Sequence, residues 1–547
     1  MTARVAIVGG GLAGITAALD CAAAGAQVTV LEVRPQLGGA AYSFDRDGLR
    51  LDNGQHVFLR CCTAYLGLLD RLGSRAMTTM QRRLDIPVLA PDGRVARLRR
   101  SGLPAPLHLG GALARYSHLA PADRARAVRA ALALRRLDPE DPRLDERSFG
   151  AWLAEHGQRP AAVDALWDLI ARPTLNVTAD DASLAQAVQV FRTGLLTSAA
   201  AGDVGWARAP LSDVHDGPAR RALAAAGVDV RLRWRVERVV AAGGAWSVEG
   251  AERVAADAVV VAVPHDRLEG LLPAGALAAP ERLSELGTSP IINLHVAYDR
   301  RVIALPFAAA VRSPVQFVFD RTESSGLDRG QLLAISLSAA DEDMQRRPEE
   351  LRARYLPALA ALFPPARSAS VERFVVTREH AATFRAAPGA KALRPAARTL
   401  LPGLALAGAH TTTGWPATME GAVLSGHTAA NEVLSVLARP AQWQAVAALP
   451  RSSSSPRCAS KHGPSRPPSA RARRCSAPAW GPSALAPQPR ALPGPPPTPS
   501  PSPASAAHSI PLCSPATWSS RPRSGGRRAP SPARLPRSWP ARCAAAG

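Results

Sequence analysis

The sequence predicts an α/β protein built on a parallel sheet, with a second part interleaved along the chain and a tail of different composition. Three observations lead to this class. Between Val5 and Glu32, an apolar segment, a glycine-rich turn, a small-residue helix and a second apolar segment follow one another. Further apolar segments then alternate with helical patterns, which is typical of α/β proteins. The composition changes sharply at Pro440.

The strands and helices can be placed from their hydrophobic patterns. Val5–Val8 and Gln27–Leu31 are predicted strands, joined by a helix over 15–24. Further helices are expected over 115–137, 151–170, 351–363 and 420–437, paired strands within 227–240, and buried strands at 257–263, 291–298, 332–338 and 404–407.

The tail accounts for most of the excess positive charge. The 547 residues carry 66 basic and 44 acidic side chains, a net charge of +22. The segment 440–547 holds 15 of the basic side chains and no acidic one, so the segment 1–439 has a net charge of 51 − 44 = +7. The basic character is therefore weak support for a nucleic-acid partner, and none is expected.

The tail itself is predicted to be disordered and dispensable. It holds 24 of the 50 prolines, and it cannot bury enough apolar surface to offset its chain entropy. The chain has two lysines against 64 arginines, which indicates a GC-rich gene. Reading such a gene out of frame yields this composition, so the tail is either an out-of-frame end or a basic membrane anchor. Truncation after Arg439 distinguishes the two.

Several other classes of protein are excluded. No run approaches the ~20 apolar residues of a transmembrane helix. Residues 1–4 lead directly into an apolar strand, without the features of a signal peptide. Cys21, Cys61 and Cys62 have the spacing of neither a disulfide framework nor a metal site, so no metal is expected. We expect a cytoplasmic location, with possible attachment to the inner face of the cell membrane.

The glycine-rich turn has the spacing of a dinucleotide-binding motif. Gly9, Gly11 and Gly14 permit a tight turn, close approach of a pyrophosphate and packing of the helix on the strand. The backbone of Leu12 and Ala13 then belongs to a helix N-terminus that faces the anion. Glu32 ends the second strand, at the distance from Gly14 where a carboxylate can bind a ribose. These features predict a Rossmann-type domain.

The residues that follow identify the dinucleotide by resemblance. Glu32-Val-Arg34-Pro-Gln-Leu-Gly38-Gly39 resembles the FAD fingerprint of the flavin amine oxidase and phytoene desaturase superfamily. The segments 404–408 and 413–422 resemble that superfamily's C-terminal flavin motif, and 235–239 resembles the strand that meets the adenine. The resemblance implies FAD, and we expect it to be bound noncovalently because no Cys or His lies in a motif that we can place against the flavin as an attachment point. In addition to the glycine turn and Glu32, the resemblance implies contacts from Arg34, Gly38, Gly39, Val236, Gly408, Trp415 and Glu420.

A narrower resemblance concerns the reaction. Three segments are similar to the squalene-associated FAD-dependent desaturases, the hydroxysqualene dehydroxylases of squalene and hopanoid biosynthesis. They are Asp52-Asn-Gly-Gln-His56-Val, residues 166–176 and residues 414–423. This implies reductive removal of the hydroxyl of a C30 isoprenoid. Members of that family often carry Asp after the glycine matching Gly408, where this chain has Ala409. The side-chain contribution of this loop to cofactor binding is correspondingly weakened.

The reaction needs a proton donor for the leaving hydroxyl. By resemblance His56 and Asp52 lie near the flavin, and His410 approaches from the C-terminal motif. His56 is the first choice as catalytic residue, followed by Asp52 and His410. Each also has a structural interpretation: Asp52 as a loop cap, His56 as a hydrogen-bond partner of the flavin and His410 as a surface residue.

The two parts of the chain are expected to alternate. The FAD-binding domain is predicted to comprise three segments, 1–75, 215–265 and 400–439. An α+β substrate domain is predicted to comprise two segments, the mainly helical 76–214 and 266–399, which contains strands and helices. Residues 440–547 form the tail.

A C30 substrate also implies an apolar tunnel with a membrane-facing mouth. Three segments are candidates for that mouth: the apolar segments Leu271–Ala279 and Ile303–Val311 and the arginine-rich residues 115–136. The alternative is that the two apolar segments belong to the core and that the arginine-rich residues form a solvated basic helix face. Alternative functions are a carotenoid-type desaturase, a flavin amine oxidase and a basic protein that binds nucleic acid or membrane. The electron donor stays open.

Overall fold

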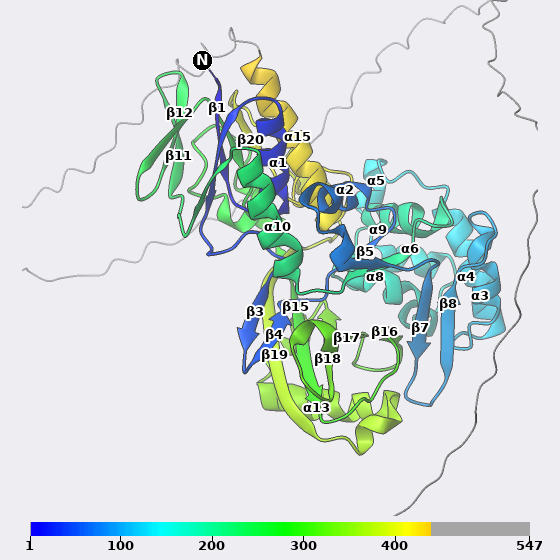
Figure 1. Ribbon diagram of the computed structural model, residues 1–547. Coiled ribbons are helices and arrows are strands. Elements are labelled where there is room, and N and C mark those ends of the chain that lie inside the picture. Colours follow the sequence, from blue (N-terminus) through cyan, green and yellow to red (C-terminus); the bar gives the residue numbers. More distant parts are fainter. Residues whose placement is uncertain (1, 439–547) are drawn as a thin grey trace, which may run out of the picture. The chain divides into compact units, whose positions relative to one another are not determined.

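The computed structural model describes residues 2–438 of the chain, and the predicted tail lies outside this range. A five-stranded parallel sheet carries the N-terminal motif (Figure 1). Its strand β1 pairs with β2 and with β14, which confirms the predicted βαβ unit. In spatial order the strands are β10 (Asp229–Leu232), β2 (Gln27–Glu32), β1 (Arg4–Val8), β14 (Ala258–Val261) and β20 (Leu404–Leu406).

Helices cover one face of this sheet and a small antiparallel sheet covers the other. Valine, isoleucine and alanine side chains of β1, β2, β14 and β20 pack against the helices in one apolar core. The helices are α1 (Leu12–Ala23), α2 (Thr63–Leu72), α10 (Leu211–Ala225) and α15 (Met419–Leu437). The alternate side chains of the same strands pack against the sheet β11 (Arg238–Ala242), β12 (Ala245–Glu249) and β13 (Arg253–Ala256).

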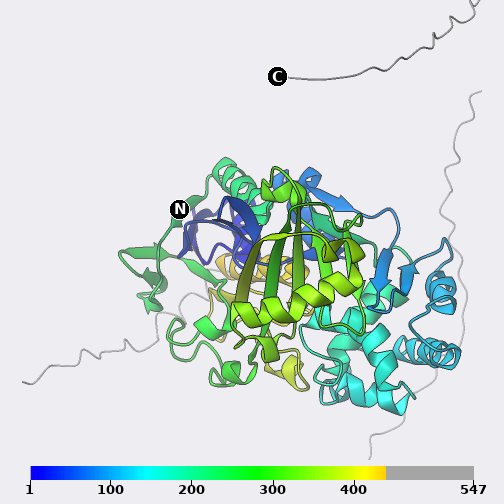
Figure 2. The same cartoon turned by 90° about the horizontal axis from the view of Figure 1, so that it is seen from below.

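A seven-stranded mixed sheet forms the second part. Helix α13 (Pro348–Leu362) lies across one of its faces and packs on alternate residues of β15 and β18 (Figure 2). The spatial order is β19 (Val371–Phe384), β15 (Thr288–Tyr298), β18 (Gln331–Ser338), β17 (Phe317–Asp320), β16 (Phe307–Ala310), β7 (Asp85–Leu89) and β8 (Val95–Arg99).

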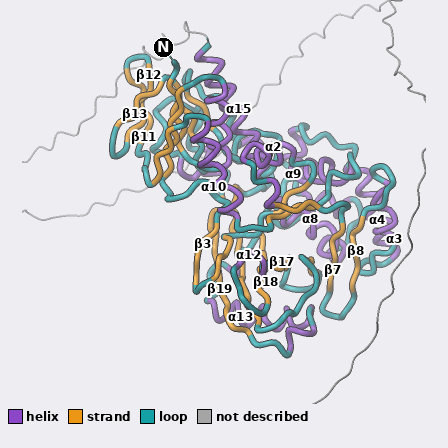
Figure 3. The backbone as a smooth tube through the Cα atoms, viewed as in Figure 1, coloured by secondary structure: helices purple, strands orange, loops and turns teal. Residues whose placement is uncertain are grey.

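A group of short helices packs beside this sheet (Figure 3). They are α3 (Gly110–Ala114), α4 (Pro121–Leu134), α5 (Pro142–Asp145), α6 (Phe149–Glu155), α7 (Pro160–Ala162), α8 (Asp168–Leu175) and α9 (Leu184–Phe191), with π-helical turns at Val163–Trp167 and Arg192–Leu196. Smaller elements complete the connections. They are the hairpin of β3 (Ser43–Arg46) and β4 (Leu49–Asp52), the three-stranded sheet of β5 (Val57–Leu59), β9 (Val204–Ala207) and β6 (Thr78–Met80), and the helices α11 (Arg282–Glu285), α12 (Thr322–Ser325) and α14 (Ala390–Leu393).

Three predicted elements were wrong. The helix expected over 115–137 begins only at Pro121, because proline lacks the N–H that an interior helical position must donate. The helix expected over 151–170 is interrupted at Gly157, which has φ +70°, and a new helix begins at Pro160. The strands within 227–240 do not pair with each other: β10 pairs with β2, whereas β11 pairs with β12.

Two apolar segments predicted as candidates for a membrane-facing mouth belong to the core. Leu271 and Ala276 are buried in the apolar cluster on the parallel sheet. Ile303 and Phe307 are buried around the seven-stranded sheet. Within residues 2–438, no helix has the length and apolarity that a membrane span requires.

The two large sheets draw on different segments. Strands of the parallel sheet lie at 4–32, 229–261 and 404–406, and strands of the mixed sheet at 85–99 and 288–384. The chain therefore passes repeatedly between the two sheets. The exact boundaries of the predicted domains stay a prediction.

Candidate functional site

The glycine turn forms an open cradle at the carboxyl end of β1. A Cβ built on Gly14 would lie 1.9 Å from the carbonyl oxygen of Gly9, so only glycine lets α1 pack here. A Cβ on Gly11 would meet nothing closer than Gly39 Cα, at 3.7 Å. Helix α1 has no side-chain cap and no acidic residue in its first turn, so its N-terminal N–H groups are available to an anion. The cradle fits a pyrophosphate.

The carboxylate of Glu32 lies beside this cradle. Its Oε2 accepts a hydrogen bond from Gly10 N (2.5 Å) and its Oε1 accepts one from Arg34 N (2.7 Å). Arg34 donates to the carbonyl oxygen of Gly39 (2.9 Å). The end of β2 and the paired glycines are thereby held next to the glycine turn.

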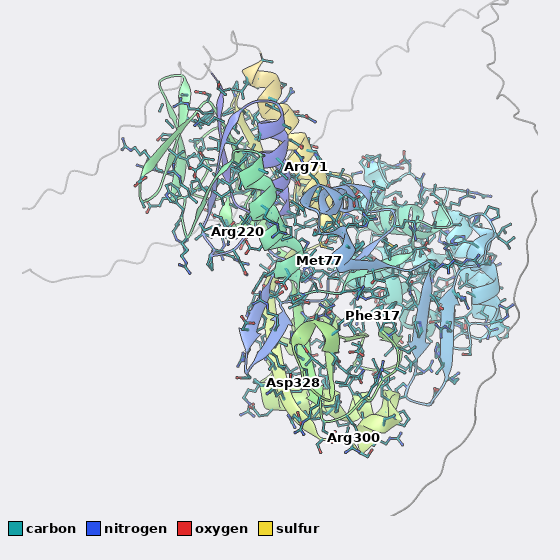
Figure 4. All side chains as sticks on the ribbon, in the orientation of Figure 1. Arg71, Met77, Arg220, Arg300, Phe317 and Asp328 are labelled. Atoms are coloured by element: carbon teal, nitrogen blue, oxygen red, sulfur yellow. The ribbon has the colours of Figure 1, made fainter. Side chains whose placement is uncertain are left out.

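Helix α10 supports the loop between Glu32 and the paired glycines. Asp216 accepts hydrogen bonds from Leu37 N and from Arg220 Nε, both 2.8 Å, and Arg220 also donates to the carbonyl oxygen of Pro35 (2.8 Å). Figure 4 labels Arg220 on α10. No sequence motif indicated this support, because the contacts to the loop join residues 179 and 185 positions apart.

The C-terminal motif reaches the same sheet edge. β20 ends at Leu406, and Gly408 follows with φ +138°. The guanidinium of Arg394 donates to the carbonyl oxygens of Ala409, His410 and Thr411, so it holds this loop by its backbone. Burial lowers the pKa of Arg394 to about 10. Arg394 thus orders the loop that contains Ala409.

The side chain of Glu420 is committed to the protein itself. It accepts hydrogen bonds from Ala64 N (3.0 Å) and Tyr65 N (2.7 Å), and so caps the N-terminus of α2. Burial raises its pKa. A cofactor contact of Glu420 would therefore come from its backbone. Trp415 is half-buried against the helical core, and Val236 lies in the extended segment between β10 and β11 rather than in a strand.

A row of polar side chains on the mixed sheet faces the 52–56 string. Asn293 Nδ2 donates to the carbonyl oxygen of Asn53 (3.0 Å), and Thr377 Oγ1 donates to the same oxygen (3.3 Å). Glu379 Oε1 accepts from Asn53 Nδ2 (3.0 Å) and from the Tyr42 hydroxyl (3.1 Å). We call Asn293, Thr377 and Glu379 the polar row. It connects the mixed sheet to Tyr42 and Asn53, which flank the hairpin β3–β4.

Asp52 occupies a buried ion pair beside this row. Its Oδ2 accepts from Arg321 Nη2 (2.7 Å), and its Oδ1 accepts from Ser43 Oγ (2.7 Å) and Leu211 N (2.9 Å). The side chains of Asp52 and Arg321 are 5% and 9% exposed. Both oxygens accept hydrogen bonds, so the geometry favours a structural role for Asp52 over the role of proton donor.

The two candidate histidines differ in accessibility. His56 is partly buried, and its Nδ1 lies 3.2 Å from the carbonyl oxygen of Gly54. Burial lowers its pKa, against the opposing effects of that carbonyl and of Asp52 and Glu379. His410 is buried against Gly408, and its Nε2 has no hydrogen-bond partner among the described residues. Burial lowers the pKa of His410 to about 3, so it is neutral at pH 7. The interpretation of His410 as a surface residue is wrong.

Several residues of this site were missed from sequence. Asn293 and His295 alternate on an otherwise apolar strand, a pattern that could have indicated one polar face. Glu379 and Arg321 gave no such signal, because their neighbours in sequence are polar or charged. Among the described residues, no group of three or more His, Cys, Asp or Glu side chains could hold a metal ion.

A parallel sheet with an open glycine cradle and a carboxylate at the end of β2 defines a dinucleotide-binding protein. The family model described as "Flavin containing amine oxidoreductase" matches residues 12–434. The chain belongs to this family of FAD-dependent oxidoreductases, and FAD is its cofactor.

Relatives with curated names include carotenoid and squalene enzymes. Hydroxysqualene dehydroxylase of Rhodopseudomonas palustris is 29% identical over 458 residues, 79% of this chain and 99% of that protein. Zeta-carotene desaturase of Zea mays is 26% identical over 468 residues, 77% of this chain and 82% of that protein. The zeta-carotene desaturase of Synechocystis is 26% identical over 80% of this chain and 98% of that protein.

Solved structures share the fold. A putrescine oxidase variant superposes with a TM-score of 0.61 at 22% identity and covers 79% of this chain and 99% of its own. Cyclohexylamine oxidase from Brevibacterium oxydans superposes with a TM-score of 0.61 at 18% identity, covering 80% and 100%. At this level of identity the similarity concerns the fold alone.

Proposed function

We propose that this protein removes the hydroxyl group of hydroxysqualene reductively and yields squalene. The observation that carries the proposal is the polar row beside His56, where the mixed sheet meets the residues that flank the hairpin β3–β4. A leaving hydroxyl needs a hydrogen-bond partner and a proton, whereas introduction of a double bond into a hydrocarbon leaves no oxygen to bind. The Rhodopseudomonas palustris relative, which matches over nearly its whole length, supports the same reaction.

Each part of the site has a role in this proposal. When bound, FAD in its reduced form supplies the hydride. Gly11, Gly39 and the N-terminus of α1 would hold its pyrophosphate, and Glu32 its ribose. His56 would border the ring and orient the substrate, and the mixed sheet would exclude water from the reacting carbon.

The test is anaerobic reduction of the purified flavoprotein followed by addition of hydroxysqualene. We expect oxidation of the flavin and one squalene for each flavin oxidised. A carotenoid desaturase is the second candidate, because zeta-carotene desaturases match the chain at 26% identity. Oxidised enzyme incubated with phytoene or zeta-carotene would then form a longer polyene, while hydroxysqualene would leave the reduced flavin unchanged.

The substrate is an isoprenoid that resides in lipid, and we further propose that the arginine-rich helical face meets anionic membrane. Val128 and Leu132 on α4 are 39% and 43% exposed. Leu132, Arg135, Arg136 and Arg192 line a surface cavity of about 330 Å³. These three arginines form no ion pair with any described residue, so their charge is available to phosphate headgroups.

A larger cavity adjoins this one. It measures about 610 Å³, shares Arg192 with the first, and is lined with hydroxyl side chains as well as Asp138.

Changing Arg135 and Arg136 to Gln should reduce co-sedimentation with phosphatidylglycerol vesicles at low salt and leave the FAD content unchanged. The matched control changes Arg300 and Arg301, an adjacent exposed pair beyond the end of β15, to Gln. Equal losses in both variants would contradict a dedicated face.

A further inference from the structure

Glu379 has one carboxylate oxygen that accepts no hydrogen bond from the residues that the structure describes. Its Oε1 accepts hydrogen bonds from Asn53 and Tyr42, which fix the position of the group. Its Oε2 makes no hydrogen bond and no ion pair with any residue in 2–438, and the side chain is only partly buried. One oxygen is therefore committed to positioning and the other is available to a ligand.

The strand places this carboxylate by means of an irregularity. Ser289 pairs with Thr383 and Ile291 pairs with Glu379, so one residue of β15 lies opposite three residues of β19. Such a bulge re-aims the neighbouring side chains and is common beside active sites. Glu379 is the last regularly paired residue before this bulge.

The carboxylate lies within one side chain of the proposed cofactor loops. Asn53 Nδ2, which donates to Glu379, also donates to the carbonyl oxygen of Ala40 (2.9 Å), next to the paired glycines. Gly39 in turn approaches Gly11 of the cradle. Glu379 also contributes to the electrostatic environment of His56. It therefore faces the junction where substrate and cofactor would meet.

The two carboxylates near this junction, Asp52 and Glu379, differ in whether an oxygen is available to bind a ligand. Asp52 accepts three hydrogen bonds, one of them from Arg321, so both of its oxygens are committed to the protein. Glu379 has no basic partner among the described residues.

We propose that Glu379 is a catalytic residue that binds the hydroxyl of the allylic alcohol and supplies its leaving proton. The inference rests on the proposed function. The C–O bond breaks with its electron pair on oxygen, the carboxyl proton passes to that oxygen, and water leaves. The carbon takes the hydride that reduced FAD supplies, so the alcohol is reduced and the flavin oxidised. The carboxylate of Glu379 then regains a proton from solvent.

The first experiment measures binding without turnover. In the oxidised holoenzyme no hydride is available, so the flavin spectrum reports only occupancy by hydroxysqualene or squalene. Glu379→Ala should raise the dissociation constant for hydroxysqualene at least tenfold and leave that for squalene unchanged. Glu379→Gln keeps a hydrogen-bonding group and should bind both ligands within about threefold of wild type. Equal affinity of Glu379→Ala and wild type for hydroxysqualene would overturn the role in binding.

The second experiment measures single turnover in the reduced enzyme. Glu379→Gln should slow squalene formation by about 10²–10⁴-fold, because an amide has no proton of suitable acidity to transfer. Glu379→Asp, which retains the carboxyl group, should recover part of the rate. The matched control is Glu372→Gln on the same strand, whose carboxylate lies 4.0 Å from Arg329 on an exposed surface. It should behave as wild type.

The outcomes separate the two proposals. Wild type that forms no squalene from hydroxysqualene overturns the proposed function and, with it, the role of Glu379. An active wild type with an equally active Glu379→Gln variant overturns the role of Glu379 alone. FAD content and thermal midpoint are measured for each variant. If Glu379→Gln does not fold, Glu379→Asp decides the question, because a shortened proton donor should still slow turnover at least tenfold.

Discussion

The ion pair between Asp52 and Arg321 allows a test of whether Asp52 stabilises the fold or acts as the proton donor. Asp52→Asn keeps its one oxygen for Ser43 and Leu211 and turns its NH₂ group toward the guanidinium of Arg321, which stays buried and charged. Removing one partner of a buried pair costs about 3–5 kcal/mol. We therefore expect the free energy of unfolding to fall by about that amount, measured by urea denaturation of the FAD-loaded protein.

A double-mutant cycle tests the cause. Asp52→Asn combined with Arg321→Met removes the uncompensated charge, but it also leaves the carbonyl oxygens of Ala207 and Ala209 without their donor. Each of these costs about 1 kcal/mol, so the double variant should be more stable than Asp52→Asn alone and about 2 kcal/mol less stable than wild type. If Asp52→Asn lies within about 1 kcal/mol of wild type while turnover falls a hundredfold, the reasoning is refuted and Asp52 is the proton donor.

Three further predictions concern the cradle and the histidines. Gly11→Val should fold without FAD, whereas Gly14→Ala should not fold, because its Cβ would lie 1.9 Å from a carbonyl oxygen; circular dichroism and flavin absorbance check both, and full flavin occupancy in Gly11→Val would contradict the placement of the motif. His56→Ala should keep FAD and lose at least tenfold in turnover; an unchanged rate would move the role elsewhere. Burial lowers the pKa of His410 to about 3, so protonation of the unfolded chain removes stability as pH falls from about 6.5 toward 3, at about 1.4 kcal/mol per pH unit. His410→Leu should flatten that part of the stability–pH curve, and an unchanged slope would argue against a neutral His410.

The sequence allowed the cofactor region to be predicted because its determinants are local. The glycine turn, α1 and the end of β2 all lie before residue 33, and their spacing alone defines a strand, a turn and a helix N-terminus. The strand at 404–406 and the helix from Met419 were also found, because a short apolar run and a small-residue helix each have a clear pattern.

The contacts that complete the site depend on long-range packing. Arg394 donates hydrogen bonds to residues 15–17 positions away, and Arg321 donates to a residue 269 positions away. Glu379 accepts hydrogen bonds from residues 326 and 337 positions away. No periodicity in the sequence reveals such pairs. β19 was not predicted, because one of its faces is only half-buried and its sequence mixes charged and apolar residues without strict alternation. His410 was considered as a surface residue, because a polar side chain in a loop gives no sign of burial.

The position of β20 at the edge of the parallel sheet has a consequence for biosynthesis. This strand and α15, which packs on α1, are translated after almost the whole body of the protein, yet they complete the sheet and the helical layer that begin with β1 and α1. A nascent chain that stops before residue 404 has the glycine turn but neither the edge strand β20 nor the helix that packs on α1. Completion of this part of the fold is therefore a late, non-local folding event. During synthesis, the exposed edge of β14 needs protection from other strands until the segment from β20 to the end of α15 emerges from the ribosome.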